Sequence, residues 1–536
     1  MINARRALVL GLIGFSHAAF AQTGPLIIDR NRPDRAPLPT PAPTTPPVDR
    51  GQVETESSAD ATGVALQQVR VEGASVDRNA IGGATQKFIG QPVTPALLKQ
   101  LGDAVAAVYA DSVVALYTVY VPQQDMSQGV VRLVVSEGYI ADVTIKGEGD
   151  HKLVRRYANK LKGEKPLLKA TLERYMSLMR DIPGLTVGAE LLRAGRPGAV
   201  NLALDLKEKP LTFTTSLDNR GTARLGRVQF GATLTANGAL REGDQTQLYA
   251  SSASDFEKYR YASITHSTPL GSEGMRAQGS FGYLRTRPKS PPINGDARTA
   301  SLQLSYPLVR GYTRNVTLIG SLDGVNSDNA VFGQTFSSEH SRALRASIAA
   351  VEGSAKRTMG GSVTASRGLD ILDARDSLLG ETEFTKINVR AQFDQALSDS
   401  IALRLRAAGQ YSGDNLPSVE QFTLGGEFGR AFESAIVTGD RGIAGSAELG
   451  WRPGGMPGFL KGSEVYSFID GGLARYRERP LLIAQQDWEL ASAGLGVRAV
   501  LGGKSWVGVE GAYALEEPFA RTGDSWRVAV SWQLSL

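Results

Sequence analysis

The chain of 536 residues is long enough for about two to four domains of ordinary size. It has no cysteine, which excludes disulfide scaffolds, thiolate metal sites and cysteine nucleophiles, and its formal net charge of +5 gives little support for a nucleic-acid partner. The four histidines, His17, His151, His266 and His340, are far apart in the sequence, so no metal site is expected.

Residues 1–21 have the pattern of a secretory signal peptide. Arg5 and Arg6 precede an apolar run from Ala7 to Phe15, and Ala19-Phe20-Ala21 supplies small residues for cleavage. No later segment approaches the roughly 18 apolar residues of a spanning helix. A mature chain that lies in a membrane must therefore cross it as a closed β-barrel, because lipid offers no partner to unpaired backbone groups.

Residues 22–61 predict an extended periplasmic linker. Six prolines fall between Pro37 and Pro47, and such a composition favours a polyproline conformation that buries no core. The alternative is that Pro25 to Ile28 and its basic neighbours insert elsewhere in the protein.

Residues 62–137 and 138–209 each predict an α+β module. A helix is expected from Pro95 to Ala110 in the first module, and two helices, near residues 152–162 and 167–180, in the second. Neither module has a convergent set of titratable groups. Small sheets with open edges favour the recognition of an extended peptide that adds a strand.

Residues 210–536 alternate with the two-residue period of β-strands. In Trp526 to Leu536, apolar residues occupy one parity and mostly polar residues the other. Sixteen strands are predicted, beginning near residues 211, 226, 244, 259, 274, 297, 314, 340, 359, 382, 400, 441, 463, 490, 504 and 526. Short connections on one side and longer ones on the other (288–296, 324–339, 368–381 and 412–440) favour an antiparallel transmembrane barrel over a soluble β protein.

The connection 412–440 is rich in glycine and has no period of its own. We expect it to fold into the barrel, where Arg430 would meet Asp470 in a bidentate pair. Strand parity supports this, since Val465, Ile469 and Leu473 share the apolar face and leave Asp470 toward the lumen. The plainer readings are a solvated loop arginine and an ordinary lumen carboxylate.

Several motifs resemble the two-partner secretion transporters of the POTRA-barrel superfamily (TpsB). In the first module Pro122-Gln123-Gln124-Asp125 and Gly129 resemble the POTRA pattern, and Pro183-Gly184 resembles that of the second. Gly429-Arg430-Ala431-Phe432 resembles the tip of the family's inward-folded loop, with Gly425, Gly426, Asp440 and Gly442 in its flanks. Phe468, Asp470, Gly471 and Gly472 resemble the barrel-wall motif that holds the tip.

Three features depart from the family pattern. Gly429 stands in place of a valine, Ala431 in place of a glycine, and Leu536 ends the chain where an aromatic residue is usual. If the replaced glycine adopts a positive φ, an alanine at that position is strained. No amphipathic plug helix is recognisable before the linker.

The resemblance implies an outer-membrane transporter that binds an unfolded passenger protein with its POTRA domains and exports it through the barrel. The implied partners are a secreted passenger and outer-membrane lipid, with the protein monomeric and the POTRA domains in the periplasm. The passenger would thread a partly basic lumen lined by residues such as Lys386, Arg390, Arg404 and Arg406. The alternative is a barrel-assembly factor of the same superfamily. A plain porin is disfavoured, because it would give residues 64–209 no function.

An enzyme is not expected. Gly502-Gly503-Lys504-Ser505 lacks the earlier glycine of a phosphate-binding loop, because Arg498 stands there, and a strand rather than a helix follows. No catalytic residues, cofactor or metal are predicted.

Overall fold

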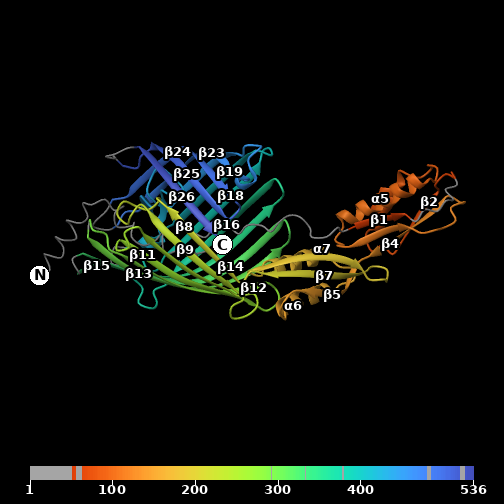
Figure 1. Ribbon diagram of the computed structural model, residues 1–536, viewed down its shortest axis with the longest axis horizontal. Helices are drawn as coiled ribbons and strands as arrows, with labels where there is room; N and C mark the ends of the chain where they lie inside the picture. Colours follow the sequence, from red (N-terminus) through yellow and green to blue (C-terminus); the bar gives the residue numbers. More distant parts are fainter. Residues whose placement is uncertain are drawn as a thin grey trace. The chain divides into compact units, whose positions relative to one another are not determined.

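The computed structural model describes the backbone of residues 51–55 and residues 63–290, 292–331, 334–376, 380–479, 484–519 and 525–536 (Figure 1). The predicted signal peptide and the proline-rich run lie outside these residues. The chain divides into two compact units, one made of Ala42–Lys209 with Arg310–Tyr312 and the other containing Pro210–Val309 and Thr313–Leu536.

The first α+β module is a mixed four-stranded sheet with the strand order β1-β3-β4-β2. Its elements are β1 (Gly51–Thr55), β2 (Gln68–Glu72), α4 (Arg78–Gln86), α5 (Pro95–Asp111), β3 (Tyr117–Val121) and β4 (Val130–Glu137). Helix α5 begins where the Thr94 hydroxyl accepts a hydrogen bond from the Leu97 N–H at 3.2 Å, and Pro95 occupies its first turn. Buried residues of α5, including Leu101 and Val105, belong to the core of this module.

Two elements of this module were not predicted. Strand β1 lies within the segment assigned to the linker, so that linker would end before Gly51 and not at residue 61; β1 pairs in parallel with β3 and so satisfies backbone groups along that edge. Helix α4 was not predicted because its apolar periodicity is weak: only Ile81 and Thr85 are buried. Gly82 and Gly83 within it also lower its helix propensity.

The second module is a three-stranded sheet with the order β5-β7-β6 and two helices. Its elements are β5 (Tyr139–Lys146), α6 (Lys152–Leu161), α7 (Lys169–Arg180), β6 (Leu185–Arg193) and β7 (Ala199–Glu208). The apolar stripes of α6 and α7, which include Leu153, Tyr157 and Met176, are buried against the sheet. Both predicted helices and all three strands are present, and each module is α+β as expected.

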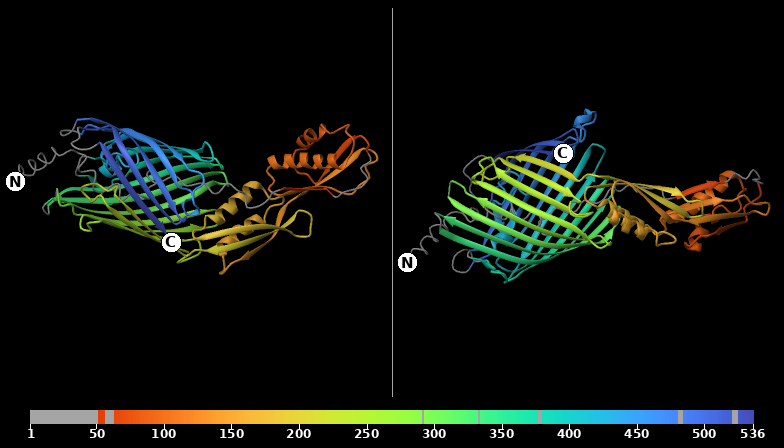
Figure 2. Two further views of the ribbon diagram at one scale, coloured as in Figure 1. Left: turned by 45° about the horizontal axis from the view of Figure 1, so that its top comes forward. Right: turned by 60° about the horizontal axis from the view of Figure 1, so that its bottom comes forward.

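The remaining strands close into an antiparallel barrel of sixteen long strands (Figures 1 and 2). They are β8 (Leu211–Asp218), β9 (Gln229–Asn237), β10 (Gln245–Ala253), β11 (Tyr259–Leu270), β12 (Met275–Thr286), β13 (Ile293–Arg310), β14 (Arg314–Val331), β15 (Gln334–Gly353), β16 (Arg357–Gly368), β18 (Thr385–Ala396), β19 (Ile401–Ser412), β22 (Arg441–Trp451), β23 (Glu464–Tyr476), β24 (Gln486–Leu501), β25 (Ser505–Glu516) and β26 (Trp526–Ser535), with the two-residue β17 (Arg375–Asp376) beside them. The last strand pairs with the first from Ser531↔Asp218 to Ser535↔Thr214, which closes the barrel. The predicted fold is confirmed.

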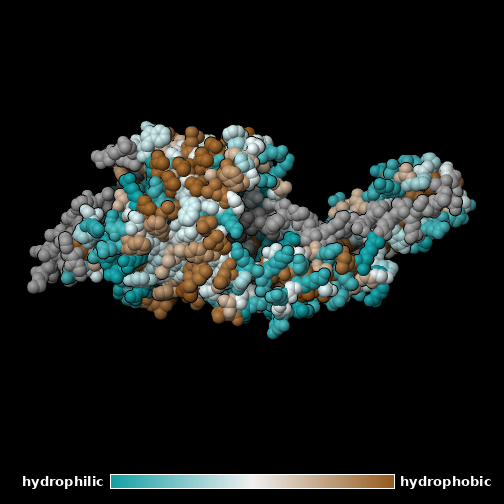
Figure 3. Space-filling view, in the orientation of Figure 1, coloured by the Kyte–Doolittle hydropathy of each residue, from teal (hydrophilic) through white to brown (hydrophobic). Residues whose placement is uncertain are grey.

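The predicted parity also holds. On β23, Val465, Ile469 and Leu473 are exposed, while Tyr466, Phe468 and Asp470 on the other parity are buried. Figure 3 shows apolar side chains gathered across the barrel strands. An apolar outer band with a polar interior is the pattern of an outer-membrane barrel.

One predicted loop is wrong. Residues 324–339 were expected to form a long outer connection, but β14 and β15 pair with each other as far as Val331↔Gln334. The polar run Asn326 to Asn329 has lost the apolar alternation, yet its backbone still pairs across the hairpin. None of the helices in the described parts of the chain combines the length and the apolar composition needed to cross a membrane.

Candidate functional site

The connection between β19 and β22 folds inward. Within it lie the one-turn helix η1 (Ser418–Glu420) and two short antiparallel strands, β20 (Phe422–Leu424) and β21 (Val437–Gly439). Its apolar side chains pack against the inner wall in a buried cluster that includes Leu424, Phe428 and Phe432 from the loop and Tyr466 and Phe468 from β23. We call residues 412–440 the loop and residues 425–436 its tip.

Arg430 is the charged centre of the tip. Its Nη1 lies 3.1 Å from Glu448 Oε2 and 3.1 Å from Glu510 Oε2, and its Nε lies 3.2 Å from Asp470 Oδ2. Its backbone N–H also donates to Asp470 Oδ1 at 3.2 Å, and its guanidinium lies 4.1 Å from the centre of the Phe468 ring. Three strands, β22, β23 and β25, therefore hold one side chain.

This arrangement differs from the bidentate pair that the sequence predicted. Asp470 takes only one guanidinium nitrogen together with the backbone N–H, because two further carboxylates, Glu448 and Glu510, share the opposite end of the guanidinium. Asp470 is held in turn by a hydrogen bond from the Ser492 hydroxyl. The prediction that Arg430 and Asp470 act in export is still untested.

The wall around the tip is a network of alternating charges. Glu448 Oε1 lies 2.8 Å from both Arg404 and Arg498, and Glu464 lies 2.6 Å from both of these arginines. Cross-strand pairing brings these groups together, since Arg404 faces Glu448 and Glu464 faces Arg498 in register. Glu448, Glu464 and Glu510 were not predicted as site residues, although all three stand on the polar parity of their strands.

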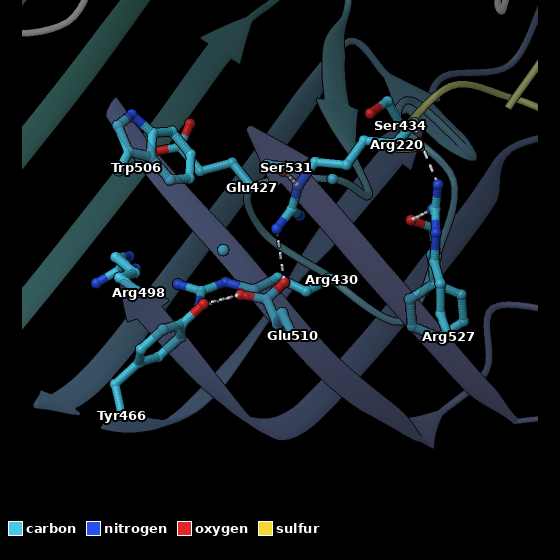
Figure 4. Close-up of a pocket in the computed structure, with 13 residues that line it drawn as sticks. Arg220, Glu427, Arg430, Ser434, Tyr466, Arg498, Trp506, Glu510, Arg527 and Ser531 are labelled. Carbon is cyan, nitrogen blue, oxygen red and sulfur yellow. Dashed lines mark hydrogen bonds and ion pairs between the residues drawn. The ribbon is translucent and has the colours of Figure 1, made fainter. Parts of the chain in front are cut away.

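The loop and the wall enclose a cavity of about 390 Å³ beside Arg430 (Figure 4). Arg220, Arg498 and Arg527 line it together with Glu510, whose Oε1 lies 3.1 Å from Arg220 Nη2. The Tyr466 hydroxyl donates to the other oxygen of Glu510 at 2.9 Å. The guanidinium of Arg430 thus borders an open part of the lumen.

The alanine at the family's glycine position is not strained. The left-handed backbone conformation falls at Gly429, with φ of +121°, and Ala431 is not among the described residues with positive φ. Ala431 is fully buried, and its N–H lies 3.4 Å from the Ser492 hydroxyl oxygen. A Cβ at Gly429 would lie 2.6 Å from Leu490 Cδ1, so this tip requires its glycine one residue before the arginine.

The flanking glycines allow close packing. Gly425 and Gly426 have φ of +99° and +73°, and a Cβ on Gly425 would lie 2.1 Å from the Glu433 carbonyl oxygen. On the wall, a Cβ on Gly442 would meet Phe422 at 2.1 Å and one on Gly472 would meet Leu424 at 2.7 Å.

Two further predicted residues also fit closely into the site. A Cβ on Gly471 would lie 2.5 Å from the Leu490 carbonyl oxygen. Phe432 is buried, and its carbonyl oxygen accepts a hydrogen bond from Arg527 of β26.

Asp440, the last residue of the loop, is hydrogen-bonded to Leu416 near the start of the loop. Its Oδ1 accepts hydrogen bonds from the Leu416 N–H at 2.8 Å and from Arg479 at 2.9 Å, and its Oδ2 accepts one from the Arg477 N–H at 2.8 Å. Asp440 and Arg479 are both buried, so the carboxylate neutralises a charge out of water.

The predicted lumen cations are paired rather than free. Lys386 lies 2.9 Å from Glu420, Arg404 is shared between Glu448 and Glu464, and Arg406 lies 2.9 Å from Asp394. Arg390 is half-buried on the same face of β18 as Lys386. Glu420 of the loop neutralises Lys386, and carboxylates of the wall neutralise Arg404 and Arg406, so these three side chains do not make the lumen basic. The prediction that a passenger threads past them is untested.

The POTRA motif residues shape turns. The Gln124 side chain pairs with the backbone of Arg132 through two hydrogen bonds of 2.7 Å, and Asp125 Oδ1 accepts one from the Ser127 N–H, which lowers the pKa of Asp125. Gly129 has φ of +69° and accepts a hydrogen bond from the Gln67 N–H.

Pro122 begins the connection that contains Gln124 and Gly129, and Pro183-Gly184 lies in a turn of the second module. The Pro122 carbonyl accepts a hydrogen bond from Gln124 at 3.2 Å. Gly184 has φ of +72°, and its carbonyl accepts the Lys209 N–H at 2.7 Å. Across the described residues, no group of three or more His, Asp or Glu side chains is arranged to hold a metal ion.

Comparison with known proteins identifies the family. The family described as haemolysin secretion/activation protein ShlB/FhaC/HecB matches residues 199–499, and the ShlB-type POTRA domain matches residues 64–138. The chain belongs to the ShlB/FhaC/HecB family. It is therefore a two-partner secretion transporter of the Gram-negative outer membrane, which exports a secreted partner protein and is not an enzyme.

Individual relatives of this ShlB/FhaC/HecB member are named as transporters. The outer membrane transporter CdiB of Dickeya dadantii is 28% identical over 376 residues, covering 66% of each chain. The heme/hemopexin transporter protein HuxB of Haemophilus influenzae (strain 86-028NP) is 22% identical over 436 residues, covering 77% of this chain and 76% of HuxB.

Solved structures show the same fold. CdiB from Escherichia coli superposes with a TM-score of 0.70 at 20% identity, covering 92% of this chain and 94% of that one. BamA from Haemophilus ducreyi lacking POTRA domains 1-3 gives 0.53 at 12% identity, covering 88% of this chain and all of that one, and this is a likeness of fold alone.

Proposed function

We propose that this transporter exports its partner protein in unfolded form through the barrel lumen, and that the loop closes the lumen in the resting state. One observation carries the proposal: the tip folds inside the barrel and is held to its inner wall by Arg430, which bonds carboxylates on three strands while bordering a cavity of about 390 Å³. A partner in transit needs the space that the tip occupies, so the tip must leave its carboxylates during export.

The charge balance of the lumen suits a chain of any sequence. Arg404 and Arg498 are each paired with Glu448 and Glu464. Paired charges offer a passing polypeptide a polar surface without one strong site at which it would stop.

The open sheet edges of the two modules are the proposed receptors for the partner in the periplasm. Among the described strands, β2, β5 and β6 each pair with one neighbour only. A strand with an unpaired edge can accept an extended segment through backbone hydrogen bonds. We also propose that residues 1–21 are a signal peptide and that the two modules span about residues 62–137 and 138–209. The transporter acts as a monomer, because its own strands close the barrel.

Deletion of the gene in the native host tests the export of one partner. The culture supernatant and cell surface of the deletion strain should lack one large protein, while other outer-membrane barrels stay at normal levels. Complementation with the intact gene should restore that protein. A general loss of barrels would instead favour the assembly-factor alternative.

A further inference from the structure

A second cluster of buried charges holds the loop at its other end. Glu420, in η1, is 1% exposed, and its carboxylate lies 2.8 Å from Arg345 of β15 and 2.9 Å from Lys386 of β18. Lys386 also donates to the Glu420 carbonyl at 2.9 Å, as does Gln410 of β19 at 3.0 Å.

The surrounding wall completes this cluster. Arg345 is paired with Asp323 of β14 at 2.8 Å and donates to the Ser366 hydroxyl of β16 at 2.9 Å. Glu339 of β15 accepts hydrogen bonds from the Ser418 hydroxyl at 2.7 Å and from the Val419 N–H at 2.9 Å. Strands β15, β18 and β19 thus contact a single helical turn, which we call the base (residues 418–420), and β14 and β16 hold Arg345 in place beside it.

The base and the tip are attached to different arcs of the barrel by opposite charges. At the base, a loop carboxylate lies among wall cations on β15 and β18; at the tip, a loop cation lies among wall carboxylates on β22, β23 and β25. The loop is therefore attached to the inner wall at two sites of opposite charge pattern, on adjacent arcs of the barrel.

The two attachments differ in their access to water. The side chains of Arg345 and Lys386 are 0% exposed, whereas that of Arg430 is 13% exposed and borders the cavity. Water competes for charged groups that it can reach, and a buried charge that loses its partner has no such replacement. The tip is therefore the easier of the two to detach.

We propose that Glu420 is a positioning residue that keeps the base fixed to the wall, so that export moves only the tip and the loop never leaves the barrel as a whole. This inference rests on the proposed closure of the lumen by the loop. The ends of the tip fit such a motion, since Gly425 and Gly426, between the base and Arg430, and Ala435, after Arg430, adopt positive φ.

Two double-cysteine variants distinguish the parts, because the native chain has no cysteine. Ser418→Cys with Glu339→Cys, joined by a short bis-methanethiosulfonate, locks the base where the native side chains lie 2.7 Å apart. Glu433→Cys with Ala223→Cys, joined by the same reagent, locks the tip where the Ala223 N–H donates to Glu433 Oε1 at 2.8 Å. The measured quantity is the amount of the partner protein in the culture supernatant. The partner protein is the one that the deletion strain fails to secrete.

The base-locked transporter should export at no less than about half the rate of its unlinked form, and the tip-locked one should lose at least about 90% of export until reduced. Equal loss in both would overturn the fixed base. Normal export from the tip-locked variant would instead refute closure by the tip, and with it the proposed function.

Point variants test Glu420 itself. Glu420→Gln leaves Arg345 and Lys386 with one carboxylate fewer and should raise the open time of single channels in planar bilayers about tenfold or more. Glu420→Gln with Lys386→Met restores charge balance and should return the open time most of the way to the wild-type value. Glu352→Gln, an exposed glutamate on β15 outside the loop and its attachments, is the matched control and should change little. Failure of the neutral pair to rescue the channel would contradict an electrostatic anchor.

Discussion

Replacement of Arg430 by alanine is the sharpest test of how the tip is held. After the change, Glu448 keeps Arg404 and Arg498, and Glu510 keeps Arg220 and Tyr466. Among the described residues, Asp470 alone then loses the cation that neutralises it while remaining buried. Leaving one charge of a buried pair uncompensated costs about 3–5 kcal/mol.

We take the lower end of that range because water can enter from the cavity beside Arg430. A cost of about 3 kcal/mol shifts the equilibrium between docked and detached tips by roughly a hundredfold. Asp470→Asn should cost less, about 1–2 kcal/mol, because Arg430 keeps two glutamates and asparagine can still accept a hydrogen bond from the backbone.

Thiol accessibility measures this equilibrium. Ser434→Cys, introduced on the tip of the cysteine-free chain, reports detachment through its rate of labelling by a membrane-impermeant maleimide added outside the cells. The rate should rise in the order wild type, Asp470→Asn, Arg430→Ala. The double variant should cost about 1.5 kcal/mol less than the sum of the two single changes, since either one already breaks the pair. Full additivity would refute the contact between Arg430 and Asp470 as the source of the effect.

Four further changes probe other parts of the account. Gly425→Ala should disturb the tip and reduce export, because its Cβ would lie 2.1 Å from a carbonyl oxygen at φ of +99°, whereas Gly454→Ala meets nothing within 4 Å and should be neutral in the same export assay. Asp440→Asn leaves the buried Arg479 without a carboxylate and should make the loop sensitive to added protease while the heat-modifiable barrel persists; unchanged protease resistance would show that the contacts of Asp440 do not hold the loop. Leu495→Arg places a charge on the lipid face, where 65% of the leucine is exposed, and should destabilise the barrel by about 2–4 kcal/mol in urea unfolding from vesicles, unlike Leu495→Ile. Tyr109→Phe removes a hydrogen bond of 2.5 Å to Glu137 and should lower the free energy of unfolding of the first module by about 1 kcal/mol, with Tyr120→Phe as the control.

Much of the fold could be predicted from the sequence because strand parity carries strong information in a membrane barrel. An outward residue meets lipid and an inward residue meets polar groups, so runs such as Trp526 to Leu536 alternate clearly. The extension of β14 and β15 through residues 324–339 could not be found this way, since the apolar alternation ends while the backbone ladder continues. Strand β1 was missed because it was hidden beside the proline-rich run and pairs through backbone groups.

The site was predicted only in part, for a different reason. Glycines and one arginine marked the tip, and parity pointed Asp470 inward. The sharing of Arg430 among three carboxylates depends on the register of β22, β23 and β25, which brings Glu448 and Glu510 to one level of the wall. Glu420 was hidden for the same reason, because its partners Arg345 and Lys386 lie on strands far away in the sequence.

The central claim is that the partner protein passes through the lumen past the tip. A photo-crosslinking residue at Ser531, on the cavity wall, tests this in cells that are exporting the partner, with Leu495 on the lipid face as the control position. We predict an adduct with the exported partner at Ser531 and none at Leu495. Absence of an adduct at Ser531 during active export, or an adduct only at Leu495, would contradict the account.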